Sequence, residues 1–218
     1  LPGSRILDLG CGPGQHSLEL ARRGFGVVGV DIAEDLISSA GETAFSDESE
    51  SLDRLELDYL QRDLRDLTFA NEFDAVLNLH DGAVGYLEDD GENRKTFEMI
   101  ARCLHPGGRT LMQIPNILYA ERFLPAKTWN EGKLAIELLD RHWNADDRYV
   151  EGLILPIILE DRASMRVIPF RQRLYSIEEL FELFCAVGMS LEAILDETGT
   201  PSLPTAEQPE IFVLASKN

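Results

Sequence analysis

The chain is poor in cysteine. Its 218 residues contain three cysteines, Cys11, Cys103 and Cys185, and none of them forms a CxxC pair. An odd number without close spacing argues against a disulfide framework and against a zinc site, so we expect no bound metal. This pattern of cysteine use fits a reducing compartment, and we expect a cytoplasmic protein.

Basic residues are scarce as well. Lys and Arg number 20 against 39 Asp and Glu, which gives a formal net charge of −19. The basic residues come singly or in pairs such as Arg22-Arg23, so no basic patch offers a surface for phosphate backbones. We therefore expect neither nucleic acid nor a membrane as a partner, whereas a neutral or cationic small molecule suits this charge. The alternative is that the negative charge serves only to keep the protein soluble and has no role in attracting a ligand.

Long apolar runs are missing too. The longest, from Leu153 to Leu159, has seven residues and cannot span a bilayer. The chain opens directly on a strand-like run without a signal peptide, and we expect that an upstream segment precedes it. With 44% hydrophobic and 27% charged residues, the composition is that of one globular domain over residues 1–218, as a monomer or homodimer.

The strongest motif occupies residues 5 to 31, RILDLGCGPGQHSLELARRGFGVVGVD. An apolar run is followed by Gly10, Gly12 and Gly14, then by a helical pattern and a second apolar run that ends in Asp31. Glycines permit the sharp strand-to-helix turn and let a ligand approach the backbone. A carboxylate at the tip of the second strand can accept both hydroxyls of a ribose. This pattern indicates a site for an adenosine-containing cofactor, although a glycine turn without a ligand remains an alternative.

The glycine spacing bears on which cofactor binds. A dinucleotide fingerprint, GxGxxG, places its third glycine five residues after the first, where this chain has Gln15. The string LDLGCGPG with a downstream acid closely resembles motif I of the class I S-adenosylmethionine (SAM) methyltransferases. The phrases LHPGGRTLMQIPN and RLYSIEELFELFCAVGM resemble later parts of the same family. The resemblance is weakest from about residue 116 to residue 170.

The resemblance implies an α/β fold with a doubly wound, seven-stranded Rossmann-like sheet, mostly parallel with an antiparallel edge strand. It also implies SAM as the cofactor and S-adenosylhomocysteine (SAH) as the product. The residues that match the family's cofactor positions are Asp8, Gly10, Cys11, Gly12, Gly14, Asp31, Ile32, Asp63, Leu64, Leu79 and His80. Asp63 also fits a plain turn aspartate, and we interpret Cys11 as a packing residue rather than a nucleophile.

After residue 115 the periodicity changes to alternation. Three extended segments, Lys133 to Trp143, Tyr149 to Leu159 and Met165 to Leu174, predict an antiparallel β meander added to the parallel sheet. We expect this insertion, residues 116–174, to build the acceptor pocket, as in related small-molecule methyltransferases. The candidates for its walls are Trp129, Trp143, Tyr149 and Phe170. Beyond the insertion, Ser176 and Glu179 form a capping box that predicts a helix, and we expect its buried stripe to consist of Ile177, Leu180, Phe181 and Phe184.

For catalysis, His80 is the first candidate, because histidine titrates near neutrality and this one follows a central strand. A histidine that only shapes the pocket is an equal alternative, and Tyr86 and His142 are weaker candidates. We expect methyl transfer to a small-molecule acceptor, at nitrogen rather than oxygen, from a loose resemblance of HDGAVGYL to N-methyltransferases. The competing hypotheses are a non-catalytic SAM-binding module and an NAD(P)-linked dehydrogenase.

Overall fold

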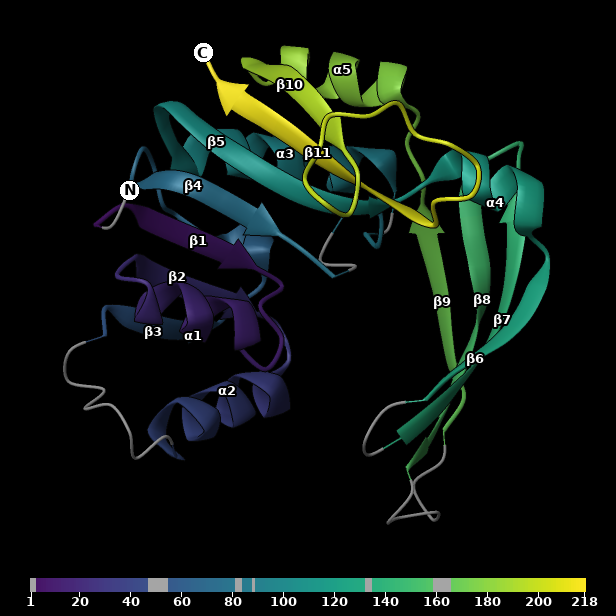
Figure 1. Ribbon diagram of the computed structural model, residues 1–218, viewed down its shortest axis with the longest axis horizontal. Helices are drawn as coiled ribbons and strands as arrows, with labels where there is room; N and C mark the ends of the chain where they lie inside the picture. The colour runs from purple at the N-terminus through teal and green to yellow at the C-terminus, as the bar shows by residue number, and fades with distance from the viewer. Residues whose placement is uncertain (1–2, 47–54, 81–83, 88, 132–134, 159–165) are drawn as a thin grey trace.

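The computed structural model describes residues 3–46, 55–80, 84–87, 89–131, 135–158 and 166–218. Its larger sheet has seven strands in the order β10-β11-β5-β4-β1-β2-β3 (Figure 1). These strands are β1 (Arg5–Leu9), β2 (Gly26–Asp31), β3 (Leu57–Gln61), β4 (Phe73–Asn78), β5 (Leu104–Pro115), β10 (Met189–Leu195) and β11 (Glu210–Lys217).

The order of the strands reverses at β1, and this reversal positions the site. Strand β1 pairs in parallel with β2 on one side and with β4 on the other. The chain therefore leaves the carboxyl ends of these strands in opposite directions, which opens a crevice where ligands bind in such sheets. At the far edge, β11 runs antiparallel to both β5 and β10. The predicted doubly wound, mostly parallel sheet is confirmed.

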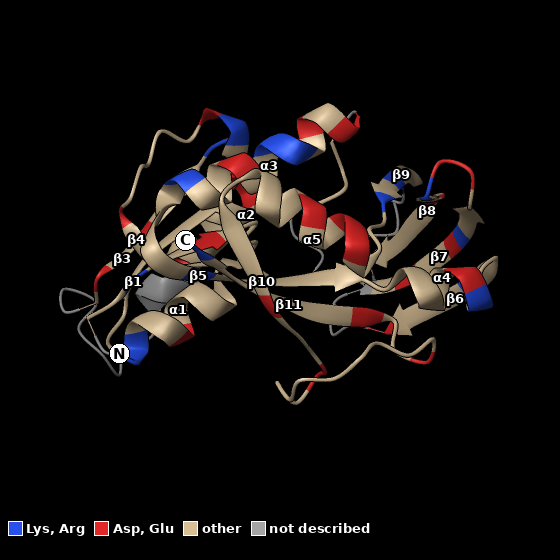
Figure 2. Ribbon diagram, turned by 90° about the horizontal axis from the view of Figure 1, so that it is seen from above, with Lys and Arg blue, Asp and Glu red and all other residues tan. Residues whose placement is uncertain are grey.

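Helices cover both faces of this sheet, because alternate strand residues point to opposite sides. They are α1 (Gln15–Arg22), α2 (Glu34–Ser46), α3 (Asp90–Cys103) and α5 (Ile177–Ala186). On one face Ile6 and Val27 pack with Ala21 of α1. On the other face Leu7 packs with Ile100 of α3 in the main core. Figures 1 and 2 show α1 and α3 on opposite sides of the sheet. Burial on both faces explains why the central strands are almost wholly apolar.

Helix α5 begins with the predicted capping box, in which Ser176 and Glu179 bond reciprocally. Leu180 and Phe184 are fully buried, as expected for the inner stripe. The sequence pattern also places Phe181 in that stripe, and this is wrong, because Phe181 is 54% exposed. Helix α5 lies against β10 at the edge of the sheet, so only part of its circumference is covered.

The insertion forms a second sheet of four antiparallel strands, in the order β6-β7-β8-β9. They are β6 (Ala126–Glu131), β7 (Ala135–Asn144), β8 (Tyr149–Ile158) and β9 (Ile168–Arg173). The expected meander is present, but it stands beside the seven-stranded sheet instead of extending it (Figure 1). Four of the residues expected in its strands lie outside the described part: Lys133, Leu134, Leu159 and Met165.

Strand β6 and the short helix α4 (Ile117–Phe123) were not predicted from the sequence. The helix begins at Asn116, whose side chain accepts the N–H of Leu118 at 3.1 Å. Its Ala120 packs with Val150 and Leu174 in a small core of its own. This core attaches α4 to the inner face of the four-stranded sheet, the face that is turned toward the rest of the molecule.

Basic residues do not gather on one element in the part of the chain that is drawn with charges (Figure 2). Helix α5 has two acidic residues in its first turn and no basic residue in its last turn. Among the described helices, none has the length and apolar character needed to cross a membrane.

Candidate active site

The loop between β1 and α1 carries the three glycines of the motif. Gly10, Gly12 and Gly14 have φ angles of 66°, 53° and 75°, a region that side chains with a Cβ rarely adopt. The N–H of Gly10 donates to Val30 O at 2.8 Å, which fixes the loop against the end of β2. At Gly14 space is limiting as well, because an added Cβ would collide with the ring of Tyr59. An added Cβ on Gly12 would meet no atom within 4 Å.

Asp31 lies at the carboxyl end of β2 and is tied to this loop. Its Oδ2 accepts the N–H of Gly12 at 2.9 Å, and its Oδ1 accepts the N–H of Ala33 at 2.9 Å. A carboxylate oxygen has two lone pairs, so each oxygen keeps one for a further donor. The two carboxylate oxygens are therefore held in place by the protein and can still accept two hydroxyl groups from a ligand.

Asp8, near the end of β1, and Cys11, within the loop, are both buried. Asp8 is 2% exposed and accepts the hydroxyl of Ser17 at 2.6 Å, which joins β1 to the beginning of α1. Burial raises the pKa of Asp8 above its usual value. Burial also raises the pKa of Cys11 to about 12, so this residue carries a thiol rather than a thiolate at neutral pH. This environment agrees with a packing role for Cys11.

A cleft of about 250 Å³ opens at the ends of β2 and β3. It is lined by Gly10, Val30, Asp31, Ile32, Arg62, Asp63, Leu64, Arg65, Tyr86 and Leu87. Ile32 is 66% exposed, an unusual position for a large apolar side chain. Together with Leu64 and Leu87 it gives the cleft apolar walls beside a carboxylate. Such a combination suits a flat ring joined to a sugar.

Asp63 has a partner that the sequence did not predict. Its carboxylate accepts the Arg65 side chain, with Nη2 at 2.6 Å and Nε at 3.0 Å, and it also accepts the backbone N–H of Arg65. These hydrogen bonds from Arg65 hold the pKa of Asp63 below its usual range. Asp63 therefore has the hydrogen bonds of a turn aspartate, and it also lines the cleft.

His80 follows β4 and has an unusual backbone, with a φ of 51°. Its N–H donates to Gln113 Oε1 at 3.1 Å, and its ring stacks on His16 of α1 with 5.0 Å between centroids. Neither His80 nor Leu79 is among the lining residues of the 250 Å³ cleft. The next residues of this loop, 81–83, lie outside the described part.

Asn78 was missed by the sequence reasoning. It is fully buried at the end of β4, and its Nδ2 donates to the carbonyl of Leu9 at 3.1 Å. Its Oδ1 is buried without a hydrogen-bond partner among the described residues. A polar residue at the end of an otherwise apolar strand, LNLH, was the available signal.

A second cavity, of about 150 Å³, lies between the two sheets. Tyr86 lines both this cavity and the cleft, so the two are neighbours with one side chain in common. The other lining residues are Pro115, Asn116, Tyr119, Ala120, Leu124, Leu139, Arg141, Val150, Ile154, Phe170, Gln172, Leu174, Pro209 and Glu210.

Of the four expected wall residues, Phe170 lines this cavity and the others do not. Trp129 is 62% exposed, so its assignment as a wall is wrong. His142, a weaker catalytic candidate, is 61% exposed at its side chain and contacts Asp140 at 2.9 Å. Asp140 alternates with Arg141 along β7, so it points away from the cavity. The alternation in the sequence correctly predicts strands here, but it does not reveal which face of the four-stranded sheet is turned toward the cavity.

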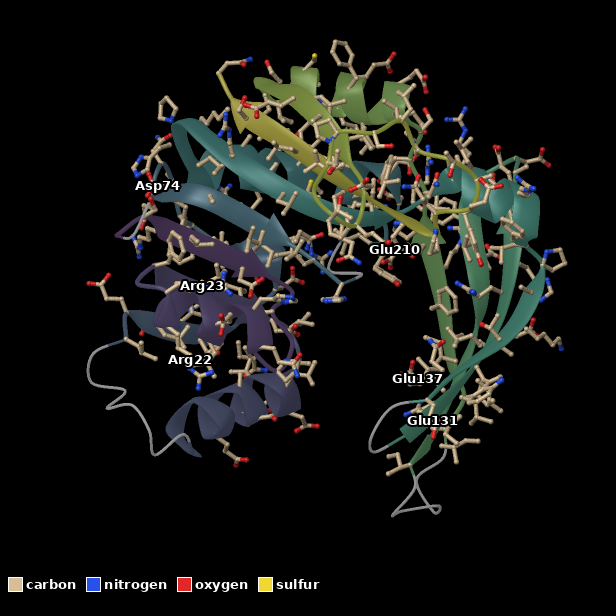
Figure 3. The ribbon with its side chains drawn as sticks, viewed as in Figure 1. Arg22, Arg23, Asp74, Glu131, Glu137 and Glu210 are labelled. Carbon is tan, nitrogen blue, oxygen red and sulfur yellow. The ribbon has the colours of Figure 1, made fainter. Side chains whose placement is uncertain are left out.

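Glu210 enters the second cavity from the beginning of β11, between the two sheets (Figure 3). Its carboxylate accepts a hydrogen bond from Gln113 Nε2, while the other end of the Gln113 amide accepts the N–H of His80. Gln113 thus connects the loop after β4 to a carboxylate in the cavity. Neither Gln113 nor Glu210 was predicted, because they are 97 residues apart and only the β5–β11 pairing brings them together.

Together, a reversed parallel sheet, a glycine loop and a carboxylate at the end of β2 define a nucleotide-type cofactor site. Comparison with known proteins then indicates which class of protein carries this site. Residues 6–108 match the family model described as a methyltransferase domain. These residues, just under half of the chain, therefore form a methyltransferase domain, and the relatives below support a SAM-dependent methyltransferase. This assignment removes the dehydrogenase hypothesis.

Individual relatives agree with the family. The protein YqeM of Bacillus subtilis (strain 168), which carries the name of a methyltransferase, is 26% identical over 98% of this chain and 84% of its own length. A ubiquinone biosynthesis O-methyltransferase of Nitrosococcus oceani is 33% identical over 59% of this chain and 56% of its own length. A SAM-dependent methyltransferase structure from Clostridium acetobutylicum ATCC 824 superposes with a TM-score of 0.80 at 17% identity, covering 98% of this chain and 84% of that one.

Proposed function

We propose that this chain transfers the methyl group of SAM to the nitrogen of a small-molecule amine. One observation carries the proposal: the carboxylate of Asp31, fixed by the glycine loop, borders a cleft that shares Tyr86 with a second cavity. A donor in the cleft and an acceptor in the cavity would meet near that side chain. The proposal treats residues 1–218 as one domain in which the insertion, residues 116–174, supplies the acceptor side.

The residues of the cleft fit the cofactor. SAM, when bound, supplies a methyl group on a sulfonium, which is open to in-line displacement. Asp31 would accept the ribose hydroxyls with its remaining lone pairs, and Ile32 would pack on the adenine. The backbone of Gly10, Gly12 and Gly14 would hold the methionine portion, with Asp8 and Cys11 both buried.

The remaining predicted contacts lie at the two ends of the cleft. Asp63 and Leu64 would contact the edge of the adenine ring. The hydrogen bonds from Arg65 already use some of the lone pairs of the Asp63 carboxylate, so adenine would bind to those that remain. Leu79 and His80 would lie at the sulfonium end, after β4. The apolar side chain of Leu87 adds a wall that the sequence reasoning did not include.

Nitrogen is favoured over oxygen by the carboxylate of Glu210. During transfer the amine nitrogen forms its bond to the methyl carbon as the carbon–sulfur bond breaks with its electron pair on sulfur, and positive charge appears on nitrogen. A carboxylate in a partly enclosed cavity stabilises that charge. The extra proton of the product ammonium then leaves to solvent. A hydroxyl acceptor would instead require a base to remove its proton during attack.

The protein's main contribution would be positioning. Holding the reacting atoms in line supplies about 7–11 kcal/mol at best. Tyr86 would act as the shared wall, and His80 either as a base or as a pocket residue stacked on His16. Transfer of labelled methyl groups to a panel of amines and phenols, with wild type and His80→Ala, decides between these roles. Retained turnover with intact SAM binding would make His80 a pocket residue.

The cofactor assignment is tested by calorimetry with SAH. Asp31→Asn should weaken SAH binding at least tenfold, about 1.4 kcal/mol, because it removes the charge and one of the two paired acceptors. Asp58→Asn is the matched control, since Asp58 is an exposed aspartate on the neighbouring strand β3. Equal SAH affinity in wild type and Asp31→Asn would refute the assignment. Tight SAH binding with no turnover on any amine or phenol would indicate a non-catalytic SAM-binding module.

A further inference from the structure

The inner face of the four-stranded sheet carries an arginine in a mostly apolar surface, whose other polar side chains include Thr128 and Gln172. Arg141 of β7 lines the second cavity, and the residues around it on this face are Leu139, Val150, Ile154 and Phe170. In the register of the sheet, Arg141 is opposite Gly152, and Gly152 is opposite Phe170. Gly152 has no side chain, and the Phe170 ring takes up the space beside it: an added Cβ would lie 2.9 Å from that ring.

Arg141 lacks the partners that a partly buried guanidinium normally has. Its Nε is buried and has no hydrogen-bond partner among the described residues. Of the residues that the structure describes, its Nη2 contacts Thr128 Oγ1 alone, at 3.5 Å. Within the described part, no carboxylate lies close enough to form an ion pair with it, although acidic residues outnumber basic ones in the chain by 39 to 20.

Glu210 lines the same cavity but forms no ion pair with Arg141 in the described structure. A guanidinium and a carboxylate therefore border one cavity at separate places, one on each sheet. Leaving a buried donor without a partner is unfavourable, and an anion on the ligand removes that cost.

We propose that the methyl acceptor carries an anionic oxygen group, a carboxylate or a phosphate, and that Arg141 binds this group. The proposal rests on the function proposed above and specifies its substrate class: an amine that also bears an acid. Arg141 would bind the acid at the four-stranded sheet, and Glu210 would receive the amine at the end of the seven-stranded sheet. Arg141 would thus orient the acceptor without contacting the reacting atoms.

The test follows the side-chain Nε–H resonance of Arg141 by NMR in the SAH-saturated full chain, assigned by its disappearance in Arg141→Met. The probes are phenylacetate, phenylphosphonate and the neutral isostere phenylacetamide. We expect phenylacetate or phenylphosphonate to shift this resonance saturably and to bind at least about tenfold more tightly than phenylacetamide. The more effective of the two acids then identifies the group as a carboxylate or a phosphate.

Variants separate recognition from general effects of charge. Arg141→Met should lose the preference for the acid, measured by competition, and Arg141→Lys should keep part of it because the charge remains. Lys127→Met is the matched control: it removes one positive charge from the outer face of the same sheet, where Lys127 pairs with Asp140. It should leave the preference within about twofold of wild type.

Turnover gives an independent readout. Wild type should transfer labelled methyl groups to phenylalanine with a kcat/KM at least about tenfold above that for phenethylamine, and Arg141→Met should abolish the difference. Two results overturn the proposal: no saturable shift with either acid, or a preference for the acid that persists in Arg141→Met. SAH binding is measured on the same samples. If the wild-type protein does not bind SAH, the proposed function itself is overturned. If it binds SAH but shows no preference for the acid, only this inference is overturned.

Discussion

The two sheets of this molecule differ in how much of their surface is buried. The central strands of the seven-stranded sheet are covered by helices on both faces, and β1 and β2 are buried along almost their whole length. The four-stranded sheet is covered on one face, and its outer face exposes Trp129, Leu138 and Leu153. A sheet buried on two faces restricts nearly every position to apolar residues, whereas a sheet buried on one face restricts every second position.

This difference divides the two proposed halves of the site, the cofactor cleft and the acceptor cavity. The cofactor half depends on backbone geometry, a glycine loop and one carboxylate at a strand end, and these features leave clear marks in the sequence. The acceptor half depends on which side chains of a one-sided sheet point inward, and these residues vary in type. The predictions below test how independent the two halves are.

The largest expected effect concerns burial. Phe184→Ala should lower the free energy of unfolding by about 3–5 kcal/mol, because this side chain is fully buried in the main core. Trp129→Ala, on the outer face of the four-stranded sheet, should change it by less than about 0.5 kcal/mol. Urea unfolding followed by circular dichroism measures both. A large loss in Trp129→Ala would mean that the outer face is covered in solution.

The second prediction concerns the glycine loop. Gly14→Ala should cost about 3 kcal/mol of stability and at least tenfold in SAH affinity, because the new Cβ would meet Tyr59 and the φ angle of 75° is unfavourable for alanine. Gly41→Ala is the control: Gly41 lies inside α2 with open space at its Cβ, so alanine should add about 0.5–1 kcal/mol. Normal SAH binding in Gly14→Ala would contradict the proposed loop function.

The third prediction makes the corresponding change in the other sheet. Gly152→Ala should cost about 1–3 kcal/mol, because the added Cβ would meet the carbonyl oxygen of Asp140 and would lie 2.9 Å from the Phe170 ring. It should leave SAH affinity within about twofold of wild type, since Gly152 is not among the residues that line the cleft. A parallel loss of SAH affinity, measured by calorimetry, would show that the two halves of the site are coupled.

The smallest expected effect is a dependence on pH. Burial raises the pKa of Asp8 in the folded protein, so this group favours folding most below its unfolded pKa, and that contribution is lost as pH rises through the folded value. Asp8→Asn cannot ionise and can still accept the hydroxyl of Ser17. Its melting temperature relative to wild type should therefore rise from acidic to neutral pH. The exposed control Asp58→Asn should show a smaller trend in the same calorimetric scans.

Much of the fold was predictable from local patterns, and the misses have specific causes. The capping box at Ser176 and the run before Gly10 were read correctly, because they are local signals. Phe181 was misplaced because helical periodicity does not show how far the neighbouring sheet extends beneath α5. Strand β6 was missed because its alternation is dominated by polar residues, AKTWNE, which resemble a loop.

The candidate site divides in the same way. The positions of Gly10, Asp31 and Ile32 around one cleft agree with the expectation from the motif. The pairing of Arg65 with Asp63 and the connection from His80 through Gln113 to Glu210 were not visible in the sequence. The second of these depends on the pairing of β11 with β5, and no local pattern specifies which distant strands become neighbours.

The sequence by itself determined the class of protein and its cofactor half, because a tight turn at a strand end accepts few residues other than glycine and therefore leaves a recognisable spacing. Only the tertiary structure decided the arrangement of the proposed acceptor half. Which face of the four-stranded sheet turns inward, and that Arg141 and Glu210 border one cavity from two separate sheets, follow from packing between segments far apart in the chain.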